Sequence, residues 1–458
     1  MHKNNHTTLT IVIMSIPIFI ELLLQLLVGN IDQFMISQYS QDSVAAIGNG
    51  NQVMNIAIIV LNAMSLATTV LLAQYLGAQD KRKISQICTV SVLVITVASV
   101  IAGALMVGLN QPLFSWMNVP HSVIDEACLY LKIVGSMILI QGLYMTMTAI
   151  LRSYSLLKEV MISAIIMNIL NIVGNAILIN GLFGFPQLGI IGAGISTNIS
   201  KCIGLAFVCW LFIKKVEAKI SWKVMKPFPV EILKKLLMVG LPSGGQELSY
   251  NLSQMIILKF INIFGTAVIA TKVYASMLAN VAYVYSMAIS QATQIIVGYL
   301  MGAHEYEQAE KRVWLTCGIS IIISLSITLI IYLNSETIFG LFTTDLTIIR
   351  LGKQIIFIEF FLEFGRAINI VMTRCLVATG DVTFPVTVSL IGCWGVAVGL
   401  GYILGVHLGY GLVGIWIAMA IDECLRGIIF MIRFKSGVWK GKALVEPILE
   451  DLSEAVIA

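Results

Sequence analysis

The amino-acid sequence predicts an all-helical polytopic membrane protein with twelve transmembrane helices, arranged as two six-helix bundles related by a parallel repeat. Composition is the first observation: of 458 residues, 58% are hydrophobic and only 11% are charged, whereas soluble domains carry about 25% charged residues. The second is that apolar stretches long enough to cross a bilayer, which takes roughly 20 residues, recur along the whole chain. The third is that the two halves of the chain match at one fixed offset.

The apolar stretches fill almost the entire chain. The first of them is too long for the core of a signal peptide, so we interpret it as a membrane span that stays in the protein. The twelve predicted spans lie at 9–36, 46–76, 84–109, 123–150, 160–180, 190–213, 232–263, 267–300, 310–333, 348–373, 384–406 and 411–434.

Basic residues occur in every second loop. Lysine and arginine gather in the turn at 77–83, in the central linker and in the tail, whereas the loops at 38–43, 110–122, 181–189 and 406–410 contain none. The positive-inside rule therefore places both termini and the central linker in the cytoplasm, for a multi-pass protein of the plasma (inner) membrane. The predicted organisation is an N-terminal lobe at 1–213, a basic linker at 214–231, a C-terminal lobe at 232–435 and a cytoplasmic tail at 436–458.

An internal repeat relates the two predicted lobes. A shift of 225 residues (242 − 17) places Pro17 on Pro242, and the same shift places Gly77 and its neighbour Ala78 on Gly302 and Ala303. Six is an even number of spans, so both lobes enter the membrane in the same direction and are related by an axis along the membrane normal. Lobes of this kind enclose a substrate cavity between them, which predicts a transporter.

Several short motifs follow one another in an order that is typical of one transporter family. They are Pro17, Gln25 and Asp32, Ala45 to Gly48, Ala73 to Ala78, Asn171-x-x-x-Asn175, Gly240-Leu241-Pro242 and Ala378 to Asp381. Over nearly the whole chain this series resembles the multidrug and toxin extrusion (MATE) transporters. The resemblance implies a secondary active antiporter that exports bulky, often cationic drugs and toxins in exchange for Na⁺ or H⁺. A flippase of lipid-linked oligosaccharides with a related fold is the alternative, and it would favour a more strongly basic cavity.

The N-terminal lobe contains a candidate coupling-ion site. Asp32 lies inside the first span, where an ionisable side chain is costly unless it is paired or faces water, and therefore marks an ion or substrate path. Asn168, Asn171 and Asn175 share one face of the fifth span, and Thr197 can add an oxygen. A carboxylate with amide oxygens suits Na⁺, and a protonatable carboxylate suits H⁺. The resemblance matches Asp32 to the family's acid in the first helix, whereas asparagines that only hold helices together are the simpler explanation.

The C-terminal lobe contains a second group of charges. Glu359, Glu363 and Arg366 lie on one face of the tenth span, and Glu247 lies in the inner half of the seventh. The resemblance implies acids in these two helices, but this chain has Arg366 and Tyr250 at the matching positions. Two interpretations stay open. Glu247 and Glu363 form a coupling site, or the group is a static network of buried ion pairs.

Five further residues are candidates for the substrate cavity. Glu21 and Gln25 continue the face of the first span that carries Asp32, although Glu21 could equally pair with a basic residue. Tyr274, Met277 and Tyr283 would supply a flexible, polarizable wall for flat cations.

The sequence argues against an enzyme, a metal-binding protein and a nucleic-acid-binding protein. No nucleophile and base occur at matched depth, so we expect no enzymatic activity. The five histidines lie in loops or near span ends, so no metal site is predicted and the only expected cofactor is the coupling ion, Na⁺ or H⁺. A net charge of +4 is too small to suggest nucleic acid. The expected partners are small organic molecules and the lipid bilayer, with the chain working as a monomer.

Overall fold

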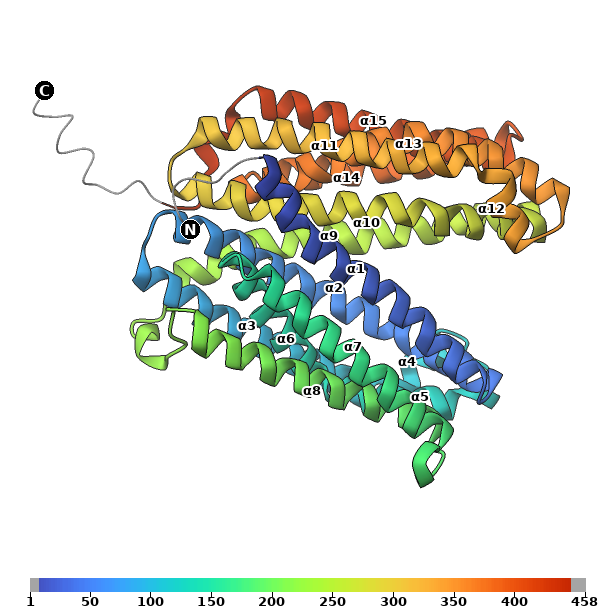
Figure 1. Cartoon of the computed structure of the whole chain (residues 1–458), viewed down its shortest axis with the longest axis horizontal. Coiled ribbons are helices and arrows are strands. Elements are labelled where there is room, and N and C mark those ends of the chain that lie inside the picture. Colours follow the sequence, from blue (N-terminus) through green and yellow to red (C-terminus); the bar gives the residue numbers. More distant parts are fainter. Residues whose placement is uncertain (1–7, 446–458) are drawn as a thin grey trace, which may run out of the picture.

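The computed structural model describes residues 8–445, apart from the side chains of Thr8, Leu9 and Phe183, and this part of the chain is a bundle of long helices (Figure 1). The α-helices before the central linker are α1 (Thr8–Ser37), α2 (Gln41–Gly77), α3 (Lys81–Gly108), α4 (Asn110–Trp116), α5 (His121–Ser136), α6 (Ile138–Ser153), α7 (Leu157–Asn180) and α8 (Gly189–Lys215). Those after it are α9 (Val230–Ile261), α10 (Thr266–Gly302), α11 (Tyr306–Leu333), α12 (Ser335–Phe342), α13 (Leu346–Thr379), α14 (Thr383–Ile391) and α15 (Gly411–Lys435).

Eight helical segments of the described chain are long and apolar enough to cross a membrane. The other four predicted spans coincide with α5 followed by α6, and with α9, α13 and α15, which are broken or carry several charged side chains. Two predicted spans differ from continuous α-helices. The fourth is interrupted at Met137, directly after the pair Gly135 and Ser136, where helices often kink. The eleventh begins as α14 and continues as π-helical turns at Gly392–Leu400 and Tyr402–His407.

The helices repeat at the offset predicted from the sequence. α2 and α10 both have 37 residues, α3 and α11 both have 28, and within each pair the first residues are 225 positions apart (266 − 41 and 306 − 81). The loops that follow α2 and α10 repeat as well, because Gln79 and His304 adopt left-handed backbone conformations with φ of 59° and 58°. The parallel repeat of two six-span lobes is therefore a property of the structure.

The two lobes lie side by side (Figure 1). α2 to α8 form one group and α9 to α15 the other, while α1 packs on both α7 and α10, and α2 packs on both α9 and α10. Both ends of the described chain lie at the same end of the molecule (Figure 1). The lobe, linker and tail boundaries given above stay predictions.

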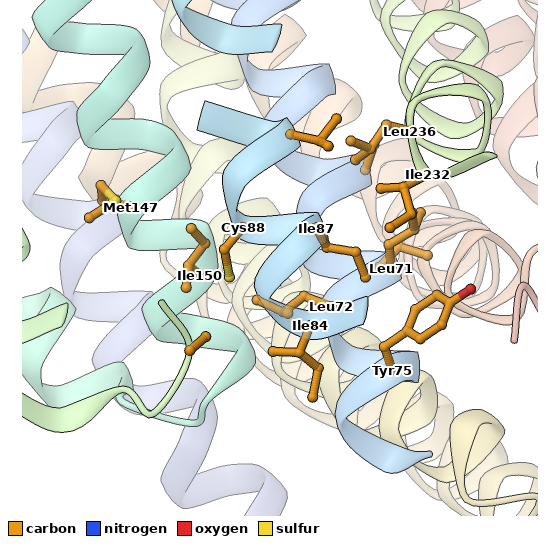
Figure 2. Close-up of a cluster of buried hydrophobic side chains, with 14 of the residues drawn as sticks. Leu71, Leu72, Tyr75, Ile84, Ile87, Cys88, Met147, Ile150, Ile232 and Leu236 are labelled. Atoms are coloured by element: carbon orange, nitrogen blue, oxygen red, sulfur yellow. The ribbon is translucent and has the colours of Figure 1, made fainter. Parts of the chain in front are cut away.

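A buried hydrophobic cluster joins the first turns of α9 to the N-terminal lobe. Figure 2 shows side chains of α2, α3 and α6, among them Leu71, Ile87 and Ile150, in one cluster with Ile232 and Leu236 of α9. All five side chains are buried. Close van der Waals packing, rather than removal of apolar surface from water, holds helices together in a bilayer, so this cluster joins the lobes by apolar packing at this end.

The end of α2 crosses the end of α10 with no room for side chains between the backbones. A Cβ atom on Gly77 would overlap the carbonyl oxygen of Tyr299, and a Cβ on Gly302 would overlap the carbonyl oxygen of Gln74. The Gln74 side chain extends the contact, because its Nε2 donates to the carbonyl oxygen of Ala378 over 2.6 Å. Glycine is required at both crossing positions for this approach.

We expect Gly302→Ala to lower the free energy of unfolding by about 1–3 kcal/mol, which is the usual cost of overpacking, because the methyl group forces two backbones apart. Thermal unfolding in detergent measures the loss. Gly318→Ala in α11 is the matched control, since a Cβ there meets nothing within 4 Å. Equal melting temperatures for the two variants would contradict the tight crossing.

Candidate functional site

A polar cluster in the N-terminal lobe brings together most of the predicted coupling-ion residues. Asn175 Nδ2 on α7 donates to Asp32 Oδ1 on α1 over 2.7 Å. Asn171 lies one turn before Asn175, and in the amide orientation that satisfies both of its neighbours its Nδ2 lies 3.2 Å from Asp32 Oδ1 while its oxygen accepts from the Thr197 hydroxyl at 3.3 Å. α1, α7 and α8 therefore each contribute to one cluster around a single carboxylate.

The cluster has unused hydrogen-bonding capacity. Asn175 Oδ1 is buried and accepts from no donor in the described part of the chain. Asn168 is buried on the same face of α7, and its Nδ2 is likewise without a described partner. Buried polar groups are rarely left unpaired, so an unpartnered amide oxygen next to a carboxylate is a ready ligand for a small cation or for water.

Lys201 on α8 is a member of this site that the sequence reasoning missed. It lies one turn after Thr197 on the same helix, and it forms no ion pair with Asp32 in the described structure. A lysine in the middle of an apolar span is the same signal that singled out Asp32, and applying that rule to α8 would have found it.

Glu21, a predicted cavity residue, forms an ion pair and lines neither of the two cavities described below. It is buried, and its Oε1 lies 2.6 Å from Nη2 of Arg152 on α6. The structure therefore favours the ion pair, which was the alternative interpretation of this glutamate. Gln25, one turn further along α1, is exposed.

The predicted charged face of α13 is a buried ion-pair network. Arg366 Nη1 lies 3.1 Å from Glu359 Oε1 and also contacts Glu363 Oε1. The second oxygen of Glu359 accepts from Trp416 Nε1 on α15 over 2.6 Å. Glu359 and Glu363 are almost fully buried; the arginine and the indole pair both oxygens of Glu359, whereas Oε2 of Glu363 has no partner in the described chain.

A second group on α15 continues this network. Arg426 Nη2 lies 2.6 Å from Asp422 Oδ2 and 2.9 Å from Glu423 Oε1. Glu423 Oε2 accepts from Asn369 Nδ2 on α13 over 2.6 Å, which links the two helices. Four carboxylates thus surround two guanidinium groups, a formal charge of −2 (2 − 4). The acids of the tenth span therefore form ion pairs in this structure, and both interpretations of the group, a coupling site and a static network, stay predictions.

A cavity of about 190 Å³ lies at the boundary of the two lobes. Its walls come from α2, α9, α10, α13, α14 and α15, and the charged side chains among them are Glu247, Arg366, Arg374, Glu423 and Arg426. Its size and mixed lining are compatible with part of an organic ligand, since ligand cavities combine apolar walls with a few polar groups.

The remaining predicted cavity residues separate into two groups. Tyr283 lines this cavity and also a neighbouring one of about 280 Å³, and the Arg366 guanidinium lies over its ring at 5.9 Å from the centroid. Tyr274 stacks on Phe342 at 5.0 Å between centroids, and neither it nor Met277 lines either of these two cavities. Arg374 was missed by the sequence reasoning, although a charged residue within a span is the signal for it.

The chain matches known transporters along nearly its whole length. The family model MatE matches residues 17–177 and 242–403, two segments that begin 225 residues apart (242 − 17), which is the offset of the internal repeat. A protein named "Uncharacterized transporter YisQ" of Bacillus subtilis (strain 168) is 38% identical over 93% of this chain and 94% of its own length. A "Probable multidrug resistance protein NorM" of Thermotoga maritima is 25% identical over 94% of this chain and 93% of its own length.

Solved structures agree with these matches at the level of the fold. A mutant of the Vibrio cholerae MATE transporter VcmN superposes with a TM-score of 0.88 at 20% identity, covering 95% of this chain and 97% of that one. MATE transporter structures have twelve membrane helices, which confirms the predicted number. The family consists of transporters, which is consistent with the expectation that the chain is not an enzyme. From its two family matches, its repeat and its fold, the chain belongs to the MatE family of multidrug and toxin extrusion transporters and is a multi-pass membrane protein.

Proposed function

We propose that the protein is a secondary active antiporter that exports organic compounds, often cationic, in exchange for Na⁺ or H⁺. The observation that carries this proposal is the cluster around Asp32. It joins a membrane-embedded carboxylate, two asparagines and a threonine from three helices, and no side-chain cation in the described chain forms an ion pair with it. A carboxylate at this depth is costly unless a cation or a proton neutralises it.

Exchange follows if the cation and the organic compound prefer different arrangements of the lobes. A ligand shifts a conformational equilibrium only by its differential affinity for the two states, and the coupling is reciprocal. The Asp32 cluster lies within one lobe, and the cavity of about 190 Å³ lies between the lobes. Cation binding to the cluster would therefore favour the arrangement in which the cavity releases its cargo.

Both candidate ions suit the cluster for a physical reason. Na⁺ prefers hard oxygen ligands, and the carboxylate of Asp32, the unpartnered Oδ1 of Asn175 and the hydroxyl of Thr197 can supply them. H⁺ requires only the carboxylate. The class of cargo rests on the relatives named as probable multidrug resistance proteins. The proposed setting is the plasma membrane, with cytoplasmic termini and a monomeric transporter.

Ion-driven dye uptake into proteoliposomes tests the proposal. Vesicles with Na⁺ or acid inside are diluted into a sodium-free, neutral medium that contains ethidium. Exit of the coupling ion is expected to drive dye entry well above the level seen without a gradient. Monensin should abolish a sodium-driven signal and a protonophore a proton-driven one. Liposomes without protein are the control.

Two outcomes would contradict the proposal. Dye uptake of equal size with and without ion gradients would rule out antiport. Absence of dye transport, together with movement of a fluorescent lipid-linked sugar between the bilayer leaflets, would instead favour the flippase alternative.

A further inference from the structure

The cavity at the lobe boundary contains two opposite charges that the described chain leaves without partners. Glu247 on α9 and Arg374 on α13 both line it. Within residues 8–445, neither side chain forms an ion pair or a side-chain hydrogen bond, either with the other or with a third residue. Glu247 is exposed and Arg374 is half-buried at the cavity wall, so both side chains are accessible to a ligand and neither has to leave a protein partner to bind it.

The other charged side chains that line the cavity already have charged partners in the protein. Arg366 and Arg426 also line it, but each contacts two carboxylates of the buried network. Glu423 is held by Arg426 and Asn369. Glu247 and Arg374 are therefore the two lining charges that a ligand can bind without breaking an existing ion pair.

The two free charges lie on different walls of the same cavity, Glu247 on α9 and Arg374 on α13. Tyr283 lies on α10, a third wall of this cavity. Tyr283 itself lines the cavity, together with apolar side chains such as Leu66 and Met287. A ligand that fills this cavity therefore meets a carboxylate on one wall and a guanidinium on another.

We propose that Glu247 and Arg374 select zwitterionic organic substrates, with Glu247 binding the cationic group and Arg374 binding a carboxylate. A purely cationic ligand satisfies Glu247 but leaves Arg374 unpaired, and a purely anionic ligand does the reverse. A ligand with both charges pairs with both residues. Selectivity arises because a purely cationic or a purely anionic ligand leaves one of the two residues unpaired and therefore binds more weakly. Arginine suits this task because its planar fork binds a carboxylate with two parallel hydrogen bonds. This inference rests on the proposed export of organic compounds and names the class of substrate.

Rhodamine B and its ethyl ester form a matched pair of probes. Both carry the same xanthene cation, and esterification removes only the negative charge of the carboxylate. Binding to the purified full-length transporter in detergent is measured by fluorescence polarisation, and efflux of each dye is then measured in energised cells. Wild type is expected to bind rhodamine B about tenfold more tightly than the ester, the difference that one charge-assisted hydrogen bond supplies.

The variants separate the two roles. Arg374→Gln should lose the preference by weakening only rhodamine B, whereas Arg374→Lys should retain part of it because the charge remains. Glu247→Gln should weaken both dyes by a similar factor and keep the preference. Arg350→Gln is the matched control, since Arg350 is on the same helix but exposed and outside the cavity. Melting temperatures confirm that each variant is folded.

The outcomes distinguish this inference from the proposed function. If wild type binds and exports both dyes equally well, or if Arg374→Gln weakens both equally, the zwitterion site is wrong while export of organic cations stands. If wild type binds rhodamine B with the expected preference but exports neither dye, the site is supported and the proposed export is contradicted. If wild type binds neither dye, the zwitterion site is contradicted, and ethidium uptake decides the proposed export separately.

Discussion

Replacing Asp32 by asparagine is expected to abolish ion-coupled dye transport, reducing gradient-driven uptake to the level of liposomes without protein. Asparagine keeps the shape of the side chain and can still hydrogen-bond to Asn175, which lies 2.7 Å away in the structure. It removes the charge that attracts Na⁺ and the site that binds H⁺. The measurement is ethidium uptake into proteoliposomes under each ion gradient, at equal amounts of reconstituted protein.

Asp42→Asn is the matched control for this variant. Asp42 lies exposed in the first turn of α2, so the same chemical change there should leave uptake unchanged. Full gradient-driven uptake by the Asp32 variant would show that coupling lies elsewhere, with Glu247 as the next candidate because the structure leaves its carboxylate unpaired.

Replacing Arg426 by methionine is expected to lower the free energy of unfolding by about 3–5 kcal/mol, the usual cost of removing one partner from a buried ion pair. Arg426 is buried and holds Asp422 and Glu423 at 2.6 and 2.9 Å. Methionine fills a similar volume but leaves two adjacent buried carboxylates without their cation. Thermal unfolding of the purified protein measures the loss.

Two further variants make this prediction specific. Lys353→Met removes a cation from an ion pair with Glu336 whose side chains are 45% and 69% exposed, so its cost should stay within about 1 kcal/mol. Neutralising Asp422 and Glu423 to asparagine and glutamine in the Arg426→Met background should recover much of the lost stability. Equal melting temperatures for Arg426→Met and Lys353→Met would contradict a stabilising network.

The network also affects how the C-terminal lobe is interpreted. From the sequence, Glu247 and Glu363 were equal candidates for a coupling site. In the structure Glu363 is bound by Arg366 and fully buried, whereas Glu247 is exposed to a cavity and unpaired. The two acids therefore have different environments in spite of their similar depth, and substitution of Glu363 is expected to act mainly through stability.

The sequence by itself determined the features of this protein that depend on local pattern. Long apolar stretches require helices in a bilayer, because no water is present to satisfy the backbone. Matches at one offset, such as Pro17 with Pro242, require a repeat, and the structure reproduces that offset in helix starts and loop conformations. Spacing of three and four residues placed Asn171 and Asn175 on one face of α7, where both lie beside Asp32.

Only the tertiary structure decided which charges meet. Arg152 on α6 binds Glu21 on α1, and Trp416 on α15 binds Glu359 on α13, across separations of 131 and 57 residues along the chain. Periodicity within one helix carries no information about the rotation of another helix against it. That rotation is set by packing of whole helix faces, so the partners of Glu21 and the isolation of Glu247 and Arg374 became evident only when the helices were placed together.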